Sequence, residues 1–144
     1  MSLLTPIRPA NATEALVLEF FDCMGPTVAD FKANYEKRLS EDAVWETVGL
    51  PARVGKRACI DYLDTLAARG MQYCTIEILG LASAADLVLS ERVDTMYRPD
   101  GTVLMPCRIM GTIQVKDGAI VRYTDYMDLS AIRVEYDRAD QASR

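Results

Sequence analysis

The amino-acid sequence predicts an α+β fold, with N-terminal helices packed on a curved, mainly antiparallel sheet that encloses an apolar pocket. Helical spacing of apolar residues dominates the first half of the chain. After Gly70 that spacing gives way to four β-rich segments, separated in part by turn sequences. Helices followed by a run of strands are typical of this class, and 144 residues are enough for one hydrophobic core. We therefore expect a single domain over residues 1–144, with a core at about 11–129 and frayed termini.

Two helices are expected between Asn11 and about Leu39, because apolar residues recur there at helical spacing. Gly25 and Pro26 interrupt the pattern and separate the two helices. Thr13 is the expected N-cap of the first helix, and Pro26 with the following threonine supplies the start signal of the second.

A short strand and a third helix are expected next. The strand is predicted over residues 40–47, before a loop at 49–51. The helix is predicted over Lys56–Ala68, where apolar residues form one stripe. Gly70 stands where a helix-terminating glycine is expected.

Four long strands complete the expected fold, at residues 73–81, 87–97, 103–115 and 119–129, where β-branched and aromatic residues are frequent. Residues 98–101 and 116–118 have the composition of tight turns. The second and third of these strands, and the third and fourth, are therefore expected to form antiparallel hairpins.

Charge and composition exclude several kinds of partner. The net charge is −5 and no run of Lys or Arg occurs, so we expect no nucleic-acid partner and no binding to an anionic membrane. The sequence shows no targeting segment and no apolar stretch of membrane-spanning length. The four cysteines have no disulfide or metal-binding spacing. These features predict a cytoplasmic protein.

The absence of histidine limits the possible chemistry. It excludes histidine-containing catalytic triads and nearly all zinc and non-haem iron sites that proteins build. We therefore expect no metal, and proton transfer is left to Asp, Glu, Lys and Tyr.

The last expected strand carries a carboxylate on its buried face. Alternation places Tyr123, Asp125 and Met127 together on the apolar face, where Tyr123 and Met127 are expected to form pocket or core wall. A buried carboxylate is unfavourable by several kcal/mol unless it is paired or hydrogen-bonded. Asp125 is therefore a candidate functional residue.

The second long strand carries opposite charges on one face. Arg92 and Asp94 lie two residues apart, with Met96 beside them. An arginine between two aspartates can keep one carboxylate ionised while the other stays protonated, so with Asp125 the set could perform acid and base catalysis together. In the alternative interpretation, Arg92 and Asp94 form a solvated cross-strand pair, and Asp125 lies at a strand end or pairs with an N-cap amide.

Three short motifs occur in an order and spacing typical of one known family. They are Glu91-Arg92-Val93-Asp94, Leu50-Pro51 with Gly55, and Gly118-Ala119-Ile120 leading into Asp125-Tyr126-Met127-Asp128-Leu129. On these motifs the sequence resembles the limonene-1,2-epoxide hydrolase family, within the larger group that includes nuclear transport factor 2, ketosteroid isomerase and SnoaL-like proteins. The resemblance extends from the first helix to about Leu129. It implies a cone-shaped fold with a mixed, mainly antiparallel sheet around an apolar pocket.

The resemblance also implies roles for the charged residues. In that family an Asp-Arg-Asp trio opens an epoxide in one step, without a covalent intermediate, a metal or an organic cofactor. Carried onto this sequence, Asp94 is the general acid, Asp125 is the base that deprotonates the attacking water, and Arg92 bridges them. The family also implies a hydrophobic small-molecule substrate and a homodimer, whose contact we place on the exposed face of the sheet.

The sequence departs from the family at the residues that hold the attacking water. The family has a tyrosine and an asparagine there, whereas this sequence has Trp45 and Thr47. Thr47 can donate and accept through its hydroxyl, but Trp45 offers only an indole N–H. Trp45 is equally interpretable as a core aromatic residue or as a pocket-lining one. Five methionines would suit an adaptable apolar cavity or an ordinary core: Met71, Met96, Met105, Met110 and Met127.

Three functions remain open from the sequence. The first is a cofactor-independent epoxide hydrolase acting on a small or medium hydrophobic epoxide. The second is an isomerase or cyclase acting on an enolisable ketone, with Asp94 and Asp125 as base and neutral acid; the neighbouring Arg92 favours the epoxide. The third is a non-catalytic domain that binds a hydrophobic ligand, which the altered water-holding pair favours.

Overall fold

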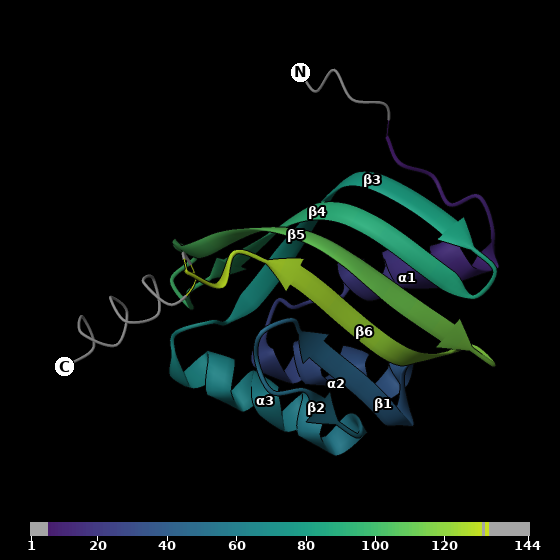
Figure 1. The fold of residues 1–144 in the computed structure, drawn as a ribbon. Coiled ribbons are helices and arrows are strands. Elements are labelled where there is room, and N and C mark those ends of the chain that lie inside the picture. Colours follow the sequence, from purple (N-terminus) through teal and green to yellow (C-terminus); the bar gives the residue numbers. More distant parts are fainter. Residues whose placement is uncertain (1–5, 131, 133–144) are drawn as a thin grey trace.

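The computed structural model describes residues 6–130 and 132, and the predicted α+β class is confirmed there (Figure 1). The frayed termini that we expected fall largely outside these residues. The elements follow in the order α1 (Ala12–Asp22), α2 (Val28–Arg38), β1 (Leu39–Thr47), β2 (Arg53–Val54), α3 (Lys56–Ala68), β3 (Tyr73–Ala84), β4 (Leu87–Tyr97), β5 (Val103–Lys116) and β6 (Ala119–Met127).

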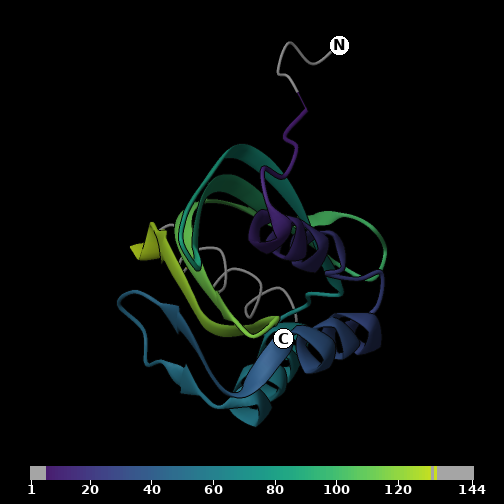
Figure 2. The ribbon, with the colours of Figure 1, turned by 90° about the vertical axis from the view of Figure 1, so that its right-hand side faces the viewer.

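The strands form one mixed sheet in the order β2-β1-β6-β5-β4-β3. Only β1 and β6 run parallel among these neighbours, and every other pair in the described chain is antiparallel. Figures 1 and 2 show that the sheet curves, with the three helices on its concave side. The two hairpins that the turn sequences predicted, β4-β5 and β5-β6, are confirmed.

The helix starts follow local capping chemistry, and one differs from the prediction. Asn11, not Thr13, is the N-cap of α1, and its side-chain oxygen accepts the backbone N–H of Glu14 at 2.9 Å. The prediction of Thr13 was wrong because the helix begins two residues earlier, where Asn11 caps it and Thr13 lies inside the first turn. The start of α2 is as predicted, since Thr27 and Asp30 form a reciprocal capping box.

Two differences in the strands have simple causes. β3 continues three residues beyond the predicted end, to Ala84, because residues 82–84 pair with the start of β4. The two-residue strand β2 was not predicted, since two residues are too few to show alternation.

The hydrophobic core lies between the concave face of the sheet and the helices. Fully buried apolar side chains come from both the helices and the sheet, among them Phe20 of α1, Leu63 of α3 and Ile113 of β5. The convex face instead exposes Met110 and Tyr126, which pair across β5 and β6 and are 52% and 55% exposed. This is the face on which a homodimer was expected, and the homodimer stays a prediction. No helix of the described chain is long and apolar enough to cross a membrane.

Candidate active site

Arg92 bridges the two predicted aspartates on the concave wall of the sheet. Its Nε donates to Asp94 Oδ1 at 2.9 Å along β4, and its Nη2 donates to Asp125 Oδ1 at 2.5 Å on β6. The three residues are 1%, 7% and 3% exposed. The alternative of a solvated pair with Asp125 at a strand end is therefore wrong, because the three charges form one buried network in mid-strand.

Gly111 of β5 makes this bridge possible. β5 lies between β4 and β6, and Gly111 is the register partner of Ser90 on one side and Asp125 on the other. A Cβ at this position would lie 2.7 Å from Arg92 Nη1 and 2.8 Å from both Asp125 Oδ1 and the Thr124 carbonyl oxygen. The guanidinium therefore crosses β5 in the space that a side chain would fill. A glycine inside a strand is a known sign of such close approach, and this signal was available in the sequence.

The Arg92 guanidinium is held on all sides. Nη1 donates to Ser90 Oγ at 3.3 Å, and Nη2 also donates to the Tyr123 hydroxyl at 3.2 Å. The Phe21 ring centroid lies 4.9 Å from Cζ, within the range of a cation–π contact. Burial lowers the pKa of Arg92, but Tyr123 and the two aspartates raise it further than burial lowers it, so the residue stays cationic.

The pKa values of the Asp94 and Asp125 carboxyl groups are shifted by different sets of neighbouring groups. Burial raises the pKa of Asp94 to about 6, with Arg92 opposing that shift and the charge of Asp125 adding to it. Burial also raises the pKa of Asp125, but more groups oppose it: first Arg92, then the indole of Trp45 and the charge of Arg53. The negative charge is thus better supported at Asp125.

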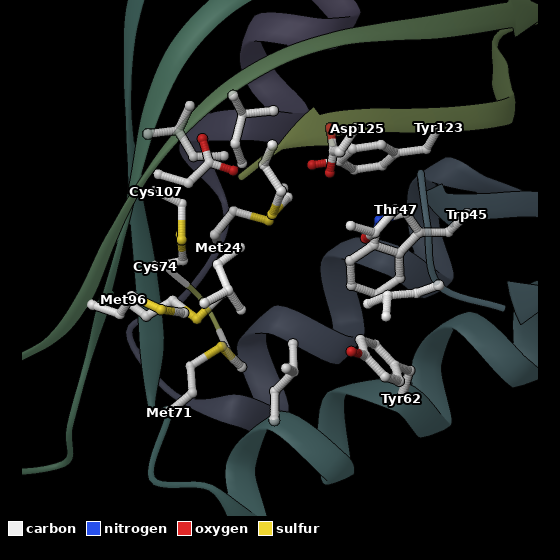
Figure 3. A pocket seen from close by; sticks show the side chains of 18 of the residues that line it. Met24, Trp45, Thr47, Tyr62, Met71, Cys74, Met96, Cys107, Tyr123 and Asp125 are labelled. Atoms are coloured by element: carbon white, nitrogen blue, oxygen red, sulfur yellow. The ribbon is translucent and has the colours of Figure 1, made fainter. Parts of the chain in front are cut away.

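A cavity of about 270 Å³ lies between this wall and the helices α2 and α3. Figure 3 shows sulfur-containing side chains along one side and Trp45, Tyr62 and Tyr123 on the other. Asp94 and Asp125 both line it. The methionines and the other apolar residues that line it are Met24, Phe31, Tyr35, Leu50, Leu66, Met71, Ile76, Met96, Met105, Ile109, Met127, Leu129 and Ile132. Of the five methionines proposed for a cavity, Met110 is therefore the exception, because it points to the convex face.

Trp45 and Thr47 border Asp125. In the parallel pair β1-β6, Thr47 is the register partner of Asp125, and Trp45 is the partner of Tyr123. Both residues line the cavity, and Trp45, at 8% exposed, is also part of the core, so its two interpretations hold together. The Trp45 Nε1–H has no hydrogen-bond partner in the described chain, although it is close enough to Asp125 to lower the pKa of that carboxyl.

Arg53 is a further residue of this region that sequence reasoning missed. Its Nη2 donates to Thr47 Oγ1 at 3.1 Å, and its Cζ lies 4.4 Å from the Trp45 ring centroid and 4.2 Å from that of Tyr62. It lies on β2, the strand too short to show a pattern, so no sequence signal marked it as buried.

A comparison with protein families identifies the chain. The model of the limonene-1,2-epoxide hydrolase catalytic domain matches residues 12–138, which is most of the sequence. The chain belongs to the limonene-1,2-epoxide hydrolase family. The motif residues that carried the resemblance lie within this match.

Solved structures related to this family member share its fold. An LEH-like epoxide hydrolase of M. tuberculosis has 22% identity and a TM-score of 0.67, over 89% of this chain and 86% of that one. A putative SnoaL-like polyketide cyclase from Jannaschia sp. has 15% identity and a TM-score of 0.70, over 92% and 96%. A hypothetical protein with a ketosteroid isomerase-like fold from Catenulispora acidiphila has 14% identity and a TM-score of 0.66, over 85% and 92%. At these identities the likeness establishes the nuclear transport factor 2-like fold alone.

The donor set of this family member is poor in metal ligands. Among the described residues, no three or more Cys, Asp or Glu side chains are grouped so that they could hold a metal ion. The sequence itself contains no histidine. The groups that can act at the cavity are therefore the two carboxyl groups with Arg92 bridging them, the guanidinium of Arg69, and the hydroxyl and indole donors of the wall.

Proposed function

We propose that the chain is a cofactor-independent epoxide hydrolase that adds water to a small or medium hydrophobic epoxide and yields a diol. The observation that carries the proposal is the buried Asp94–Arg92–Asp125 network on the wall of an apolar cavity. Buried charges of this kind cost stability, so a network of this size at a cavity wall is evidence for a functional site. Membership of the family supports the same reaction class.

In the proposed reaction, both carboxyl groups act at once. The Asp125 carboxylate takes a proton from a water molecule, the water oxygen forms a bond to one epoxide carbon, and the carbon–oxygen bond of the ring breaks. The epoxide oxygen takes the proton of the Asp94 carboxyl group. The product is a diol, and a proton must then pass from Asp125 to Asp94 before the next turnover.

The pKa differences support this assignment of roles. A general acid works best with a pKa near the working pH, and burial raises the pKa of Asp94 to about 6. Asp125 receives the shorter Arg92 hydrogen bond and the additional effects of Trp45 and Arg53, which favour its ionised form. Arg92 thus separates the protonation states of two chemically identical groups.

The cavity suits a small apolar substrate. Its volume of about 270 Å³ lies just below the range of roughly 300–1,000 Å³ that is usual for small-molecule pockets. Burial raises the pKa of the Cys74 thiol, and that of Cys107 to about 12. Since the thiolate is the reactive form of cysteine, these neutral thiols leave water as the nucleophile for an epoxide.

The test is diol formation from a panel of terpene, cycloalkene and styrene epoxides. We expect wild type to form diol and Asp125→Asn to lose roughly 100- to 10,000-fold in kcat, the usual contribution of a general base. Asp61→Asn, an exposed aspartate of α3, is the matched control and should retain full activity. A wild-type protein that is folded and forms no diol across the panel would refute the proposal.

One observation favours a second candidate, an isomerase or cyclase. Since burial raises the pKa of Asp94 to about 6, a neutral carboxylic acid is available to donate a hydrogen bond to an oxyanion. Hydrogen–deuterium exchange next to the carbonyl of an enolisable ketone, catalysed by wild type, would favour this candidate. The hydrolase predicts no such exchange.

A further inference from the structure

Arg53 is a buried cation without an ionic partner among the described residues. It is 9% exposed, and none of the ion pairs in the described part of the chain includes it. Its Nε also has no hydrogen-bond partner there. Burying a charge costs several kcal/mol, and replacing buried charged groups by apolar side chains of similar volume is often neutral or stabilising. Such a residue, in contact with two side chains of the cavity wall, calls for a functional explanation.

The contacts of Arg53 are all to residues around the base. Arg53 and Trp45 are register partners across β2 and β1, which puts the guanidinium against the indole ring. The same guanidinium donates to the hydroxyl of Thr47, the register partner of Asp125. In Figure 3 Trp45 and Thr47 lie on the same side of the cavity as Asp125. Arg53 therefore fixes two side chains next to the carboxylate without itself lining the cavity.

The unused hydrogen-bond acceptor of Thr47 and the unused donor of Trp45 are the groups needed to hold a nucleophilic water. A hydroxyl oxygen has two lone pairs and one hydrogen; Arg53 occupies one lone pair of Thr47 and leaves the other free. Among the described residues, the buried Trp45 Nε1–H makes no hydrogen bond, although it lies close enough to Asp125 to lower the pKa of that carboxyl. A water that gives one hydrogen to Asp125 and the other to Thr47, and accepts the indole N–H, keeps one lone pair for the epoxide carbon.

We propose that Arg53 is a positioning residue that holds Thr47 and Trp45 as a water-holding pair beside Asp125. This rests on the proposed hydrolase function and names the device that replaces the tyrosine and asparagine of the family. Without Arg53 the Thr47 hydroxyl rotates freely and the indole loses the cation stacked on it. With Arg53 in place, both groups are held in one orientation before the substrate binds.

The charge of Arg53 supports the same role. It is among the groups that oppose the burial-driven rise in the pKa of Asp125, and it is not among those that act on Asp94. The other charged or titratable groups that interact with Asp125 are Arg92 and Asp94 of β4, Tyr123 of β6, Tyr35 of α2, Cys74 of β3 and Cys107 of β5. Of these, only Arg92 brings a second positive charge.

The experiment compares wild type, Arg53→Met, Arg53→Lys, Thr47→Val and the double variant Arg53→Met/Thr47→Val on the best epoxide of the panel. For Arg53→Met we expect kcat to fall about 10- to 100-fold, as for a misplaced reactant, with a smaller change in KM. The acidic limb of its pH–kcat profile should move to higher pH, because Asp125 loses a cation. Arg53→Lys should restore the position of that limb but not the full kcat.

The double variant separates positioning from simple damage. If Arg53 acts through Thr47, the double variant should be little slower than the slower single variant. Unchanged kcat and pH profile in Arg53→Met, or fully additive losses in the double variant, would overturn the inference while diol formation by wild type keeps the proposed function. No diol from wild type would overturn both. Should Arg53→Met fail to fold, Thr47→Val and Arg53→Lys decide: wild-type kcat in either one overturns the inference.

Discussion

Asp94 and Asp125 are chemically identical, and only their surroundings can give them different roles. Both are buried and both touch Arg92, but Asp94 takes the single Nε–H, whereas Asp125 also has Trp45 and Arg53 nearby. Two carboxyl groups linked through one guanidinium titrate as a pair, and the form with one shared proton is the one that the proposed reaction needs.

The first prediction is a bell-shaped dependence of diol formation on pH. Activity requires a protonated Asp94, so kcat/KM should fall as pH rises through about 6. It should also fall at lower pH, where Asp125 becomes protonated. The chain contains no histidine, so no side chain with an ordinary pKa near 6 can produce these limbs.

The measurement is kcat/KM between pH 4 and pH 9 with an epoxide that is stable over that range. An Asp94→Asn variant should keep at most a small residual rate and lose the alkaline limb. The exposed Asp61→Asn should reproduce the wild-type curve. A wild-type rate that is constant from pH 5 to pH 9 would contradict the assignment of Asp94 as the acid.

At the level of elements, strand alternation accounts for much of what could be predicted. Because side chains alternate along a strand, the sequence predicted Arg92 and Asp94 on one face and Asp125 on the buried face of another strand. The structure brings all three together. Alternation cannot say which strands are neighbours, however. That β5 separates the two charged strands, and that Gly111 lies at the crossing point, depends on sheet order and register, which are set by long-range packing.

The residues that escaped prediction lie where local pattern is weakest. Arg53 is in a two-residue strand, and its burial depends on β1 and α3 packing around it. Asn11 was overlooked in favour of a second capping residue two positions later. Arg53 is buried only through tertiary packing, whereas at the start of α1 the sequence offers two capping residues and the structure uses the first.

A second prediction concerns the glycine of β5. In Gly111→Ala the added Cβ meets Arg92, Asp125 and the backbone carbonyl oxygen of Thr124, and the backbone cannot move away cheaply. We expect the free energy of unfolding to fall by about 1–3 kcal/mol, as for other overpacked sites, and kcat to fall at least about tenfold because the Arg92 bridge is displaced.

The matched control is Gly80→Ala in β3. A Cβ there would have only an ordinary contact, 3.9 Å from Glu91 Cβ, and Gly80 does not have a positive φ. Thermal unfolding and diol formation of both variants should be measured together. Equal behaviour of the two alanine variants would show that the close approach at Gly111 is not important for the network.

For the molecule as a whole, the buried network lowers the free energy of unfolding while it provides the groups that the proposed reaction needs. The carboxyl group of Asp94 has a pKa of about 6 when folded, because burial disfavours its charge. In the unfolded chain its pKa is about 3.9. Between these values the folded state binds more protons than the unfolded state, so the free energy of unfolding should fall as pH rises from about 4 to about 6. The loss from this group is on the order of 3 kcal/mol.

Asp94→Asn should therefore be a stabilising substitution that removes activity. Asparagine can still accept the Arg92 Nε–H, but it carries no charge that burial penalises. Near pH 4 the melting temperatures of variant and wild type should be similar, whereas above pH 6 the variant should melt higher. Thermal unfolding across this range, with the exposed Asp42→Asn as control, measures the difference. Parallel stability–pH curves for wild type and Asp94→Asn would mean that Asp94 is ionised in the folded protein at the same pH as in the unfolded chain, and the proposed acid would then have no proton to give.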